Sequence, residues 1–187
     1  MSEDGTTPRE RYRTQIRAEI KERAQQQIAT AGASALSLNA IAKQMGMSGP
    51  ALYRYFAGRD ELITELITDG YRSLADAFDA AAGAGADLAG LAAALRRWAL
   101  EDPQRYFLLY GTPVPGYHAP PDTTAIASRI MATLLDACPP PRAQDRALAF
   151  WTRLHGVLSL ELAGHFTGMD LDPALLYTAE AESLLRL

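Results

Sequence analysis

The stretch that decides the fold is Ser37–Phe56, which reads SLNAIAKQMGMSGPALYRYF. Two serines in it are each followed by apolar residues at helical spacing, and a glycine lies between the two runs. The residues that carry this pattern are Ser37, Leu38, Ile41, Ala42 and Met45 in the first run, Gly46 between the runs, and Ser48, Leu52 and Phe56 in the second. Two short helices joined by a tight glycine-containing turn form a helix-turn-helix, whose second helix can enter the major groove of DNA.

A longer helix is predicted ahead of this pair. Thr7, Pro8 and Glu10 form a capping box with proline at the first helical position, and Gly32 ends the helix. One apolar stripe with a spacing of four residues follows the cap, made by Tyr12, Ile16, Ile20, Ala24 and Ile28. We therefore expect a three-helix domain over residues 1–58, with a loose arm before Thr7.

The charge distribution supports a nucleic-acid partner for this domain. The 187-residue chain has a net charge of −4, which by itself argues weakly against DNA binding. Residues 9–59, however, hold nine basic and three acidic residues, a balance of +6, whereas residues 60–187 hold nine basic and seventeen acidic residues, a balance of −8. A basic N-terminal segment followed by an acidic remainder is typical of a DNA-binding module joined to another domain.

The second helix of the pair begins with small residues and continues with residues that can bind phosphate. Small side chains at its start allow a close approach to base edges, and tyrosine and arginine position the protein on the DNA backbone. The predicted DNA contacts are Thr7, Ser37, Leu38, Ser48, Gly49, Pro50, Tyr53, Arg54, Tyr55 and Arg59. Two alternatives stay open. Arg54 is either a phosphate contact or a solvated charge, and Arg9, Arg11 and Arg13 either contact the minor groove or the DNA backbone or form only a solvated arm.

The rest of the chain predicts a larger helical domain over residues 59–187. Helices are expected over 59–82, 87–101, 104–110, 122–137, 142–166 and from 173 almost to 187, which gives about nine in the whole chain. The proline-rich segment 112–121 is either a lid or a stiff connection. This all-α class follows from long stretches rich in Ala, Leu, Glu and Arg.

The helix that holds residues 147–166 is apolar on nearly every side, with only Arg153 and Glu161 charged. Such a helix needs burial on more than one side, so it either meets a second subunit or lies at the centre of a monomer. For the homodimer we expect an interface that includes Leu154, Leu158, Glu161, Leu162, Leu176 and Leu184, with Leu175, Ala179 and Leu187 on the same last helix.

Aromatic residues gather in the same domain and are either the wall of a pocket for a small organic effector or ordinary core. They are Trp98, Tyr106, Phe107, Tyr110, Tyr117 and Trp151, together with His155. His155 would hydrogen-bond either a ligand or an internal carbonyl. Glu161 and His165 are four residues apart, and a structural pair is favoured over a metal site of only two ligands. No cofactor and no metal are predicted.

Several classes of protein are excluded by absences in the sequence. The three histidines and the lone Cys138 show no catalytic or metal-ligand spacing, so an enzyme is not expected. No stretch of roughly 18 uncharged apolar residues predicts a membrane span. The first residues, MSEDGTTPRERYRTQ, lack the apolar core of a signal peptide, so a cytoplasmic protein is expected.

Four spaced motifs resemble the DNA-binding domain of TetR-family repressors. They are Leu38–Ala42, Met45–Ser48, Ala51–Phe56 and Arg59–Leu62, within a similarity that runs from Tyr12 to Leu66. The resemblance implies an all-helical homodimer that binds a palindromic operator and is released by a small ligand held in the C-terminal domain. It also implies a dimer bundle made by the last two helices.

This chain departs from the TetR pattern at two positions. The family often has His where Tyr55 stands and Lys where Arg59 stands, and both replacements keep a donor able to reach phosphate. In the C-terminal half, Trp151–Gly156 resembles a subtype marked by a Trp–His–Gly signature. Besides a DNA-binding regulator and an enzyme, the chain could be a ligand-binding dimer that has lost DNA binding. The intact segment from Ser48 to Arg59 argues against that alternative.

Overall fold

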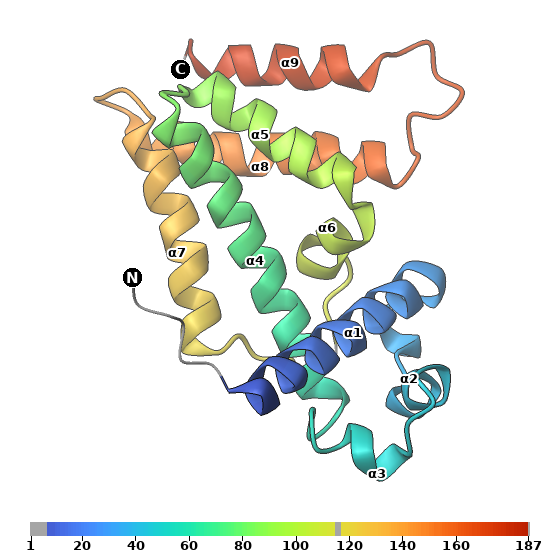
Figure 1. The fold of residues 1–187 in the computed structure, drawn as a ribbon. Helices are drawn as coiled ribbons and strands as arrows, with labels where there is room; N and C mark the ends of the chain where they lie inside the picture. Colours follow the sequence, from blue (N-terminus) through green and yellow to red (C-terminus); the bar gives the residue numbers. More distant parts are fainter. Residues whose placement is uncertain (1–6, 115–116, 187) are drawn as a thin grey trace. The chain divides into compact units, whose positions relative to one another are not determined.

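The computed structural model describes residues 7–114 and 117–186, and every regular element within these ranges is a helix (Figure 1). Nine α-helices and one short 3₁₀ helix occur in them, which confirms the predicted all-α class. The described chain divides into two compact units, one formed by residues 7–67 with 113–114 and 117–118, and one by residues 68–112 with 119–186. Among the described residues, no helix is long and apolar enough to cross a membrane.

The first unit holds the predicted three-helix domain. Its elements are α1 (Pro8–Ala31), η1 (Ala33–Ala35), α2 (Leu38–Gln44), α3 (Gly49–Leu52) and the first turns of α4 (Arg59–Gly83). The capping box is present, since Glu10 N donates to Thr7 Oγ at 3.3 Å and Thr7 N donates to Glu10 Oε2 at 2.7 Å. The arm expected before Thr7 lies outside the described residues.

The buried side of α1 is shorter than the predicted stripe. Ile20, Ala24 and Ile28 are buried, whereas Tyr12 is 61% exposed and Ile16 is half-buried. The other buried apolar residues of this unit come from the helix pair and from the start of α4, and they are Leu36, Leu38, Ile41, Ala42, Leu52, Phe56, Leu62, Ile63, Leu66 and Ile67. The core of this unit therefore includes Leu38, Ile41, Ala42, Leu52 and Phe56 of the predicted helix pair.

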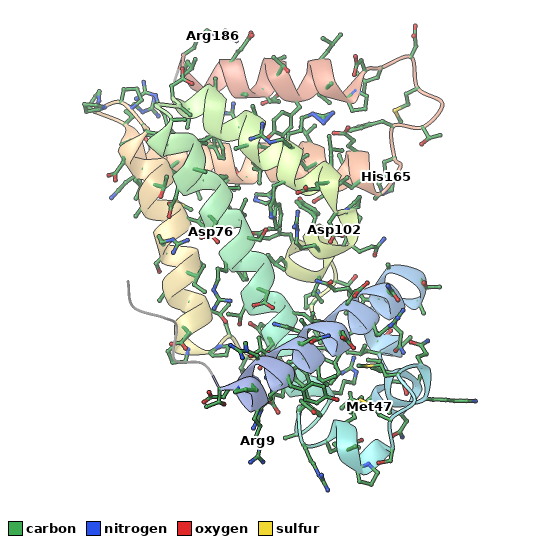
Figure 2. All side chains as sticks on the ribbon, in the orientation of Figure 1. Arg9, Met47, Asp76, Asp102, His165 and Arg186 are labelled. Carbon is green, nitrogen blue, oxygen red and sulfur yellow. The ribbon has the colours of Figure 1, made fainter. Side chains whose placement is uncertain are left out.

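Gly46 sets the turn between α2 and α3. It adopts a positive φ of 65°, a conformation that favours glycine, and Met47 N donates back to Ala42 O at 2.8 Å. Gly46 N also donates to Lys43 O at 3.2 Å, which completes a Schellman motif. Figure 2 labels Met47 in this turn. The turn directs the chain into α3 at a sharp angle, as a helix-turn-helix requires.

Helix α3 is shorter than the predicted helix over 49–56. It covers Gly49–Leu52, after which the chain winds more tightly, with i to i+3 bonds from Arg54 N to Ala51 O and from Tyr55 N to Leu52 O. We call residues 48–56 the recognition segment.

The second unit contains the rest of α4 and five further helices. These are α5 (Leu88–Glu101), α6 (Pro103–Tyr110), α7 (Pro121–Asp136), α8 (Ala143–Leu162) and α9 (Pro173–Leu184). In Figure 1, α4 and α7 run side by side, and Arg129 on α7 pairs with Asp76 on α4 at 2.7 Å. Helices α5, α8 and α9 pack on one another, and Tyr177 of α9 donates to Ala92 O of α5 at 2.8 Å.

Helix α8 ends four residues before the predicted boundary at 166. Gly164 has a φ of 77°, and His165 N donates to Leu160 O at 2.9 Å while Gly164 N donates to Glu161 O at the same distance. This second Schellman motif turns the chain away after Leu162. Figure 2 shows His165 in the turn beyond the helix. Leu187, predicted on the apolar side of the last helix, lies outside the described residues.

Candidate functional site

The recognition segment has one buried side and one exposed side. Leu52 and Phe56, four residues apart, are fully buried. Tyr53 is 48% exposed and Arg54 is exposed, whereas Tyr55 is half-buried. Tyr53 and Tyr55 thus differ in exposure, as expected for residues two apart on a helical turn.

Two polar side chains of this segment are left without internal partners. Ser48 occupies the N-cap position of α3, yet its hydroxyl makes no capping hydrogen bond. The Arg54 guanidinium makes no hydrogen bond or ion pair with the described part of the chain. Both groups are therefore available to an external acceptor such as a phosphate oxygen.

Other residues predicted to contact DNA also have structural roles. Thr7 Oγ donates to Glu10 Oε2 at 2.8 Å, and Ser37 Oγ caps α2 by accepting from Ala40 N at 3.3 Å. Arg59 donates to Ala33 O at 2.7 Å and lies 3.5 Å from an Asp60 carboxylate oxygen. Its guanidinium therefore holds the start of α4 against η1.

Leu38 is the one predicted contact whose side chain is withdrawn from solvent. It is 6% exposed and belongs to the buried side of α2. The contact of Leu38 with DNA stays a prediction, and with the side chain in the core it would be made by the backbone. Gly49 and Pro50, also predicted to contact DNA, are the first two residues of α3. A Cβ built on Gly49 would lie 3.5 Å from Asn39 Oδ1, which is an ordinary van der Waals distance.

Sequence reasoning missed Arg17, which holds the recognition segment in place. Its guanidinium donates to the Tyr55 carbonyl oxygen and to a Glu65 carboxylate oxygen, and it lies 4.1 Å from the centre of the Phe56 ring. Glu61 is also near, at 3.8 Å. Arg17 and Lys21 on α1 repeat the four-residue spacing of Glu61 and Glu65 on α4, which is the signal that would have revealed this network.

The second unit brings most of the predicted aromatic residues together. Ring centres of Tyr110 and His155 are 4.3 Å apart, those of Trp151 and His155 are 4.4 Å apart, and those of Tyr106 and His155 are 5.6 Å apart. We define the aromatic cluster as Trp98, Tyr106, Phe107, Tyr110, Trp151 and His155, with Tyr71 of α4 at its edge, 6.0 Å from Tyr110. Tyr117 belongs to the other unit and is not counted with this cluster.

Polar atoms of the cluster are unevenly paired. Tyr106 Oη lies 3.0 Å from His155 Nδ1, 3.1 Å from His155 O and 3.0 Å from Ser159 Oγ. His155 Nε2 and Tyr110 Oη are buried and have no hydrogen-bond partner among the described residues. Burial lowers the pKa of His155 to about 4 and raises the pKa of both tyrosines, so all three groups are neutral at pH 7.

Three leucines predicted at a dimer interface lie in the core instead. Leu154, Leu158 and Leu184 are fully buried among side chains of their own chain. A second copy could not touch these side chains, so this part of the prediction is corrected. The reverse side of α8 carries an exposed stripe every four residues, and the exposed residues on α8 and α9 include Leu148, Thr152, Gly156, Leu160, Leu175, Thr178 and Ala179.

The remaining predicted interface residues are partly accessible. Leu162 and Leu176 are half-buried. Glu161 pairs with Arg96 at 2.6 Å, both side chains being less than one-fifth exposed, so it joins α8 to α5 rather than pairing with the exposed His165. Among the described residues, no group of three His, Cys, Asp or Glu side chains is placed to hold a metal ion.

Two family profiles match this chain. The profile described as "Bacterial regulatory proteins, tetR family" matches residues 20–66, and "Tetracyclin repressor-like, C-terminal domain" matches residues 88–184. An HTH-type transcriptional regulator of Mycobacterium tuberculosis is 36% identical, over 92% of each chain. The chain belongs to the TetR family. It is a transcriptional regulator and not an enzyme, as the sequence predicted.

Solved structures agree with this assignment. The crystal structure of the regulatory protein SCO4313 has a TM-score of 0.92 and 66% identity, covering 97% of this chain and all of that one. The TetR-family regulator PfmR from Thermus thermophilus shares the fold, with a TM-score of 0.62 and 19% identity over 89% and 97% of the two chains. The Trp–His–Gly subtype of this TetR-family chain stays a prediction.

Proposed function

We propose that this TetR-family regulator is a repressor that binds a two-fold symmetric operator as a homodimer and leaves it when a small organic effector binds. The observation that carries the proposal is the outward side of the recognition segment, where Ser48 and Arg54 have no internal partner and Tyr53 is exposed. Residues 1–58 would bind DNA and residues 59–187 would bind the effector and the second subunit. Its place of action is the cytoplasm, where the chromosome lies.

Phosphate contacts position the dimer on the operator in this proposal. Arg54 and the hydroxyls of Ser48 and Tyr53 donate to backbone oxygens, while the small Gly49 lets the helix approach the bases. Arg59 supports DNA binding indirectly in this proposal, by holding the start of α4 in place, because its guanidinium already donates to Ala33 O. Two recognition segments of one dimer would enter successive major grooves about 34 Å apart.

The exposed side of α8 and α9 is the proposed dimer face. Leu148 is 63% exposed, Leu160 45% and Leu175 69%, which is unusual for leucines on neighbouring helices that also cover the core. Thr152 and Thr178 bond carbonyl oxygens of their own helices, so their hydroxyls need no other partner in an interface. Gly156 has open space beside its Cα, which allows a second helix to pack closely.

The aromatic cluster is the proposed effector site. Its rings offer apolar surface, and two of its buried polar atoms lack partners. A TetR variant from Acinetobacter baumannii, which shares the fold at a TM-score of 0.58, was crystallised with minocycline. Helix α4 begins at Arg59 and carries Tyr71 against Tyr110, so an effector that favours a different position of α4 would lower operator affinity.

Binding to DNA from the protein's own promoter region tests the proposal. Replacing both Tyr53 and Arg54 by alanine should abolish the low-salt complex measured by fluorescence anisotropy, while the mass of the dimer stays unchanged. Arg97→Ala is the matched control, since Arg97 is exposed on α5 in the other unit, and it should bind as the wild type does. Equal affinity of the double variant and the wild type would refute the proposed DNA contacts.

A further inference from the structure

The aromatic cluster contains two buried polar atoms, on rings in contact, that nothing in the described chain satisfies. They are His155 Nε2 and Tyr110 Oη, on rings whose centres are 4.3 Å apart. Buried polar atoms are normally hydrogen-bonded, and an orphaned pair inside apolar surroundings is a strained arrangement that a ligand can relieve. We propose that His155 and Tyr110 recognise a hydroxyl group, and that the effector is an uncharged phenol or apolar alcohol. This inference rests on the proposed function, in which the cluster is the effector site.

The hydrogen bonds around Tyr106 decide which proton His155 carries. The His155 carbonyl oxygen lies 3.1 Å from Tyr106 Oη and can only accept, and we assign the single tyrosine proton to it. Tyr106 Oη must then accept from the other two neighbours, Ser159 Oγ and His155 Nδ1, each 3.0 Å away. In this arrangement the imidazole is protonated on Nδ1, and Nε2 presents a lone pair.

A ligand hydroxyl complements this pair in both directions. Its proton is donated to the lone pair on His155 Nε2, and its oxygen accepts from the Tyr110 hydroxyl. An ether or ketone of the same shape satisfies only Tyr110 and leaves the imidazole unpaired. Discrimination is strong in such sites because the analogue that lacks a donor leaves a buried acceptor without a partner.

Anionic effectors are disfavoured by the same atoms. A carboxylate would place negative charge against the Nε2 lone pair, and burial keeps His155 neutral by lowering its pKa to about 4. The nearest arginine of α6, Arg105, is already bonded to Ser73 Oγ and to Trp98 O. Arg96 is bound to Glu161 at 2.6 Å. Each cation is thus already paired with a carboxylate, Arg105 with Glu101 at 3.4 Å and Arg96 with Glu161, although Arg105 Nε is buried without a partner.

Three probes of matched shape test the inference on the intact protein. They are para-butylphenol, its methyl ether para-butylanisole, and para-butylbenzoate, and binding is read from tryptophan fluorescence, since Trp151 lies 4.4 Å from the His155 ring. The phenol should bind at least about tenfold more tightly than the ether, because the ether leaves the imidazole nitrogen unpaired. The benzoate should bind most weakly. Equal binding of phenol and ether, or tightest binding of benzoate, would overturn the inference.

Variants separate hydroxyl recognition from general packing. Tyr106→Phe removes the acceptor that fixes the Nδ1 proton, so the imidazole can turn its N–H to the ligand and the preference for phenol over ether should shrink to about twofold or less. Tyr177→Phe, which removes another buried tyrosine hydroxyl bonded to Ala92 O, should leave the preference unchanged. An unaltered preference in Tyr106→Phe would contradict the tautomer assignment, which ¹⁵N shifts of the His155 ring measure directly.

DNA binding of each preparation is measured alongside the probes. If the protein binds promoter DNA but none of the three probes, the inference about His155 and Tyr110 fails while the proposed DNA-binding function stands. If the probes bind as expected but no DNA is bound, the effector chemistry stands and the proposed function fails.

Discussion

Replacing Leu148 by glutamine should weaken the dimer without destabilising the subunit. Leu148 lies on the exposed stripe of α8, and 63% of its surface is accessible in the single chain. Leucine and glutamine have similar helix propensities, so the fold of the separate subunit should tolerate the change. The effect should therefore fall on association alone.

The size of the effect follows from the exposed area. Complete burial of a leucine side chain contributes roughly 1.5–3 kcal/mol, so burial of the exposed 63% of Leu148 contributes about 1–2 kcal/mol. A two-fold symmetric interface buries the residue from both subunits, which doubles the loss to about 2–4 kcal/mol. The dimer dissociation constant should accordingly rise by a factor of roughly 30 to several hundred.

Sedimentation equilibrium over a range of protein concentrations measures this constant. Leu100→Gln is the matched control, because Leu100 is 42% exposed on α5, outside the proposed face, and its replacement should leave the constant unchanged. If Leu148→Gln dimerises as tightly as the wild type, or if the control weakens the dimer equally, the proposed face on α8 and α9 is refuted.

Three further predictions concern stability and positioning. Because the folded-state pKa of His155 is lowered to about 4 from an ordinary value near 6.5, its contribution to stability is complete above about pH 6.5 and is lost as the pH falls toward 4. Over this interval the free energy of unfolding in urea should therefore fall by up to roughly 3 kcal/mol less in His155→Gln than in the wild type. Identical pH profiles of the two proteins would contradict the buried neutral imidazole. Arg17→Met should lower stability by about 1–3 kcal/mol and weaken DNA binding with the dimer intact, whereas wild-type DNA affinity would show that Arg17 does not position the recognition segment. Gly46→Ala should cost about 1–2 kcal/mol in thermal unfolding, since φ is 65° there, and a gain in stability would contradict that conformation.

Helix boundaries were predictable where the local sequence contains a capping motif. The capping box at Thr7 and Glu10 and the turn at Gly46 rest on local hydrogen bonds, so local sequence was sufficient. Helix α8 ends earlier than predicted because Gly164, which lies within an apolar run, has a positive φ and belongs to a Schellman motif. The helix over 49–56 was too long because tight turns replace regular helix after Leu52.

The sites were predictable only in part. Aromatic residues from α5, α6 and α8 do meet, which spacing on separate helices suggested but could not establish. A helix that is apolar all round does not reveal which side faces its own core, so the sequence predicts Leu154 and Leu158 at an interface, although they are buried and Leu148 and Leu160 are exposed. The role of Arg17 depends on contacts with residues 38 to 48 positions away, which only the folded chain brings together.

Selection of DNA fragments from the organism's own genome by the purified protein, followed by sequencing, tests the central claim most directly. The account predicts that the selected fragments share a two-fold symmetric sequence, and that their binding weakens steeply as salt rises, because phosphate contacts release counterions. Fragments that share no sequence, or binding that is equally weak for every fragment at low salt, would contradict a sequence-specific TetR-family regulator that uses Tyr53 and Arg54 to hold its operator.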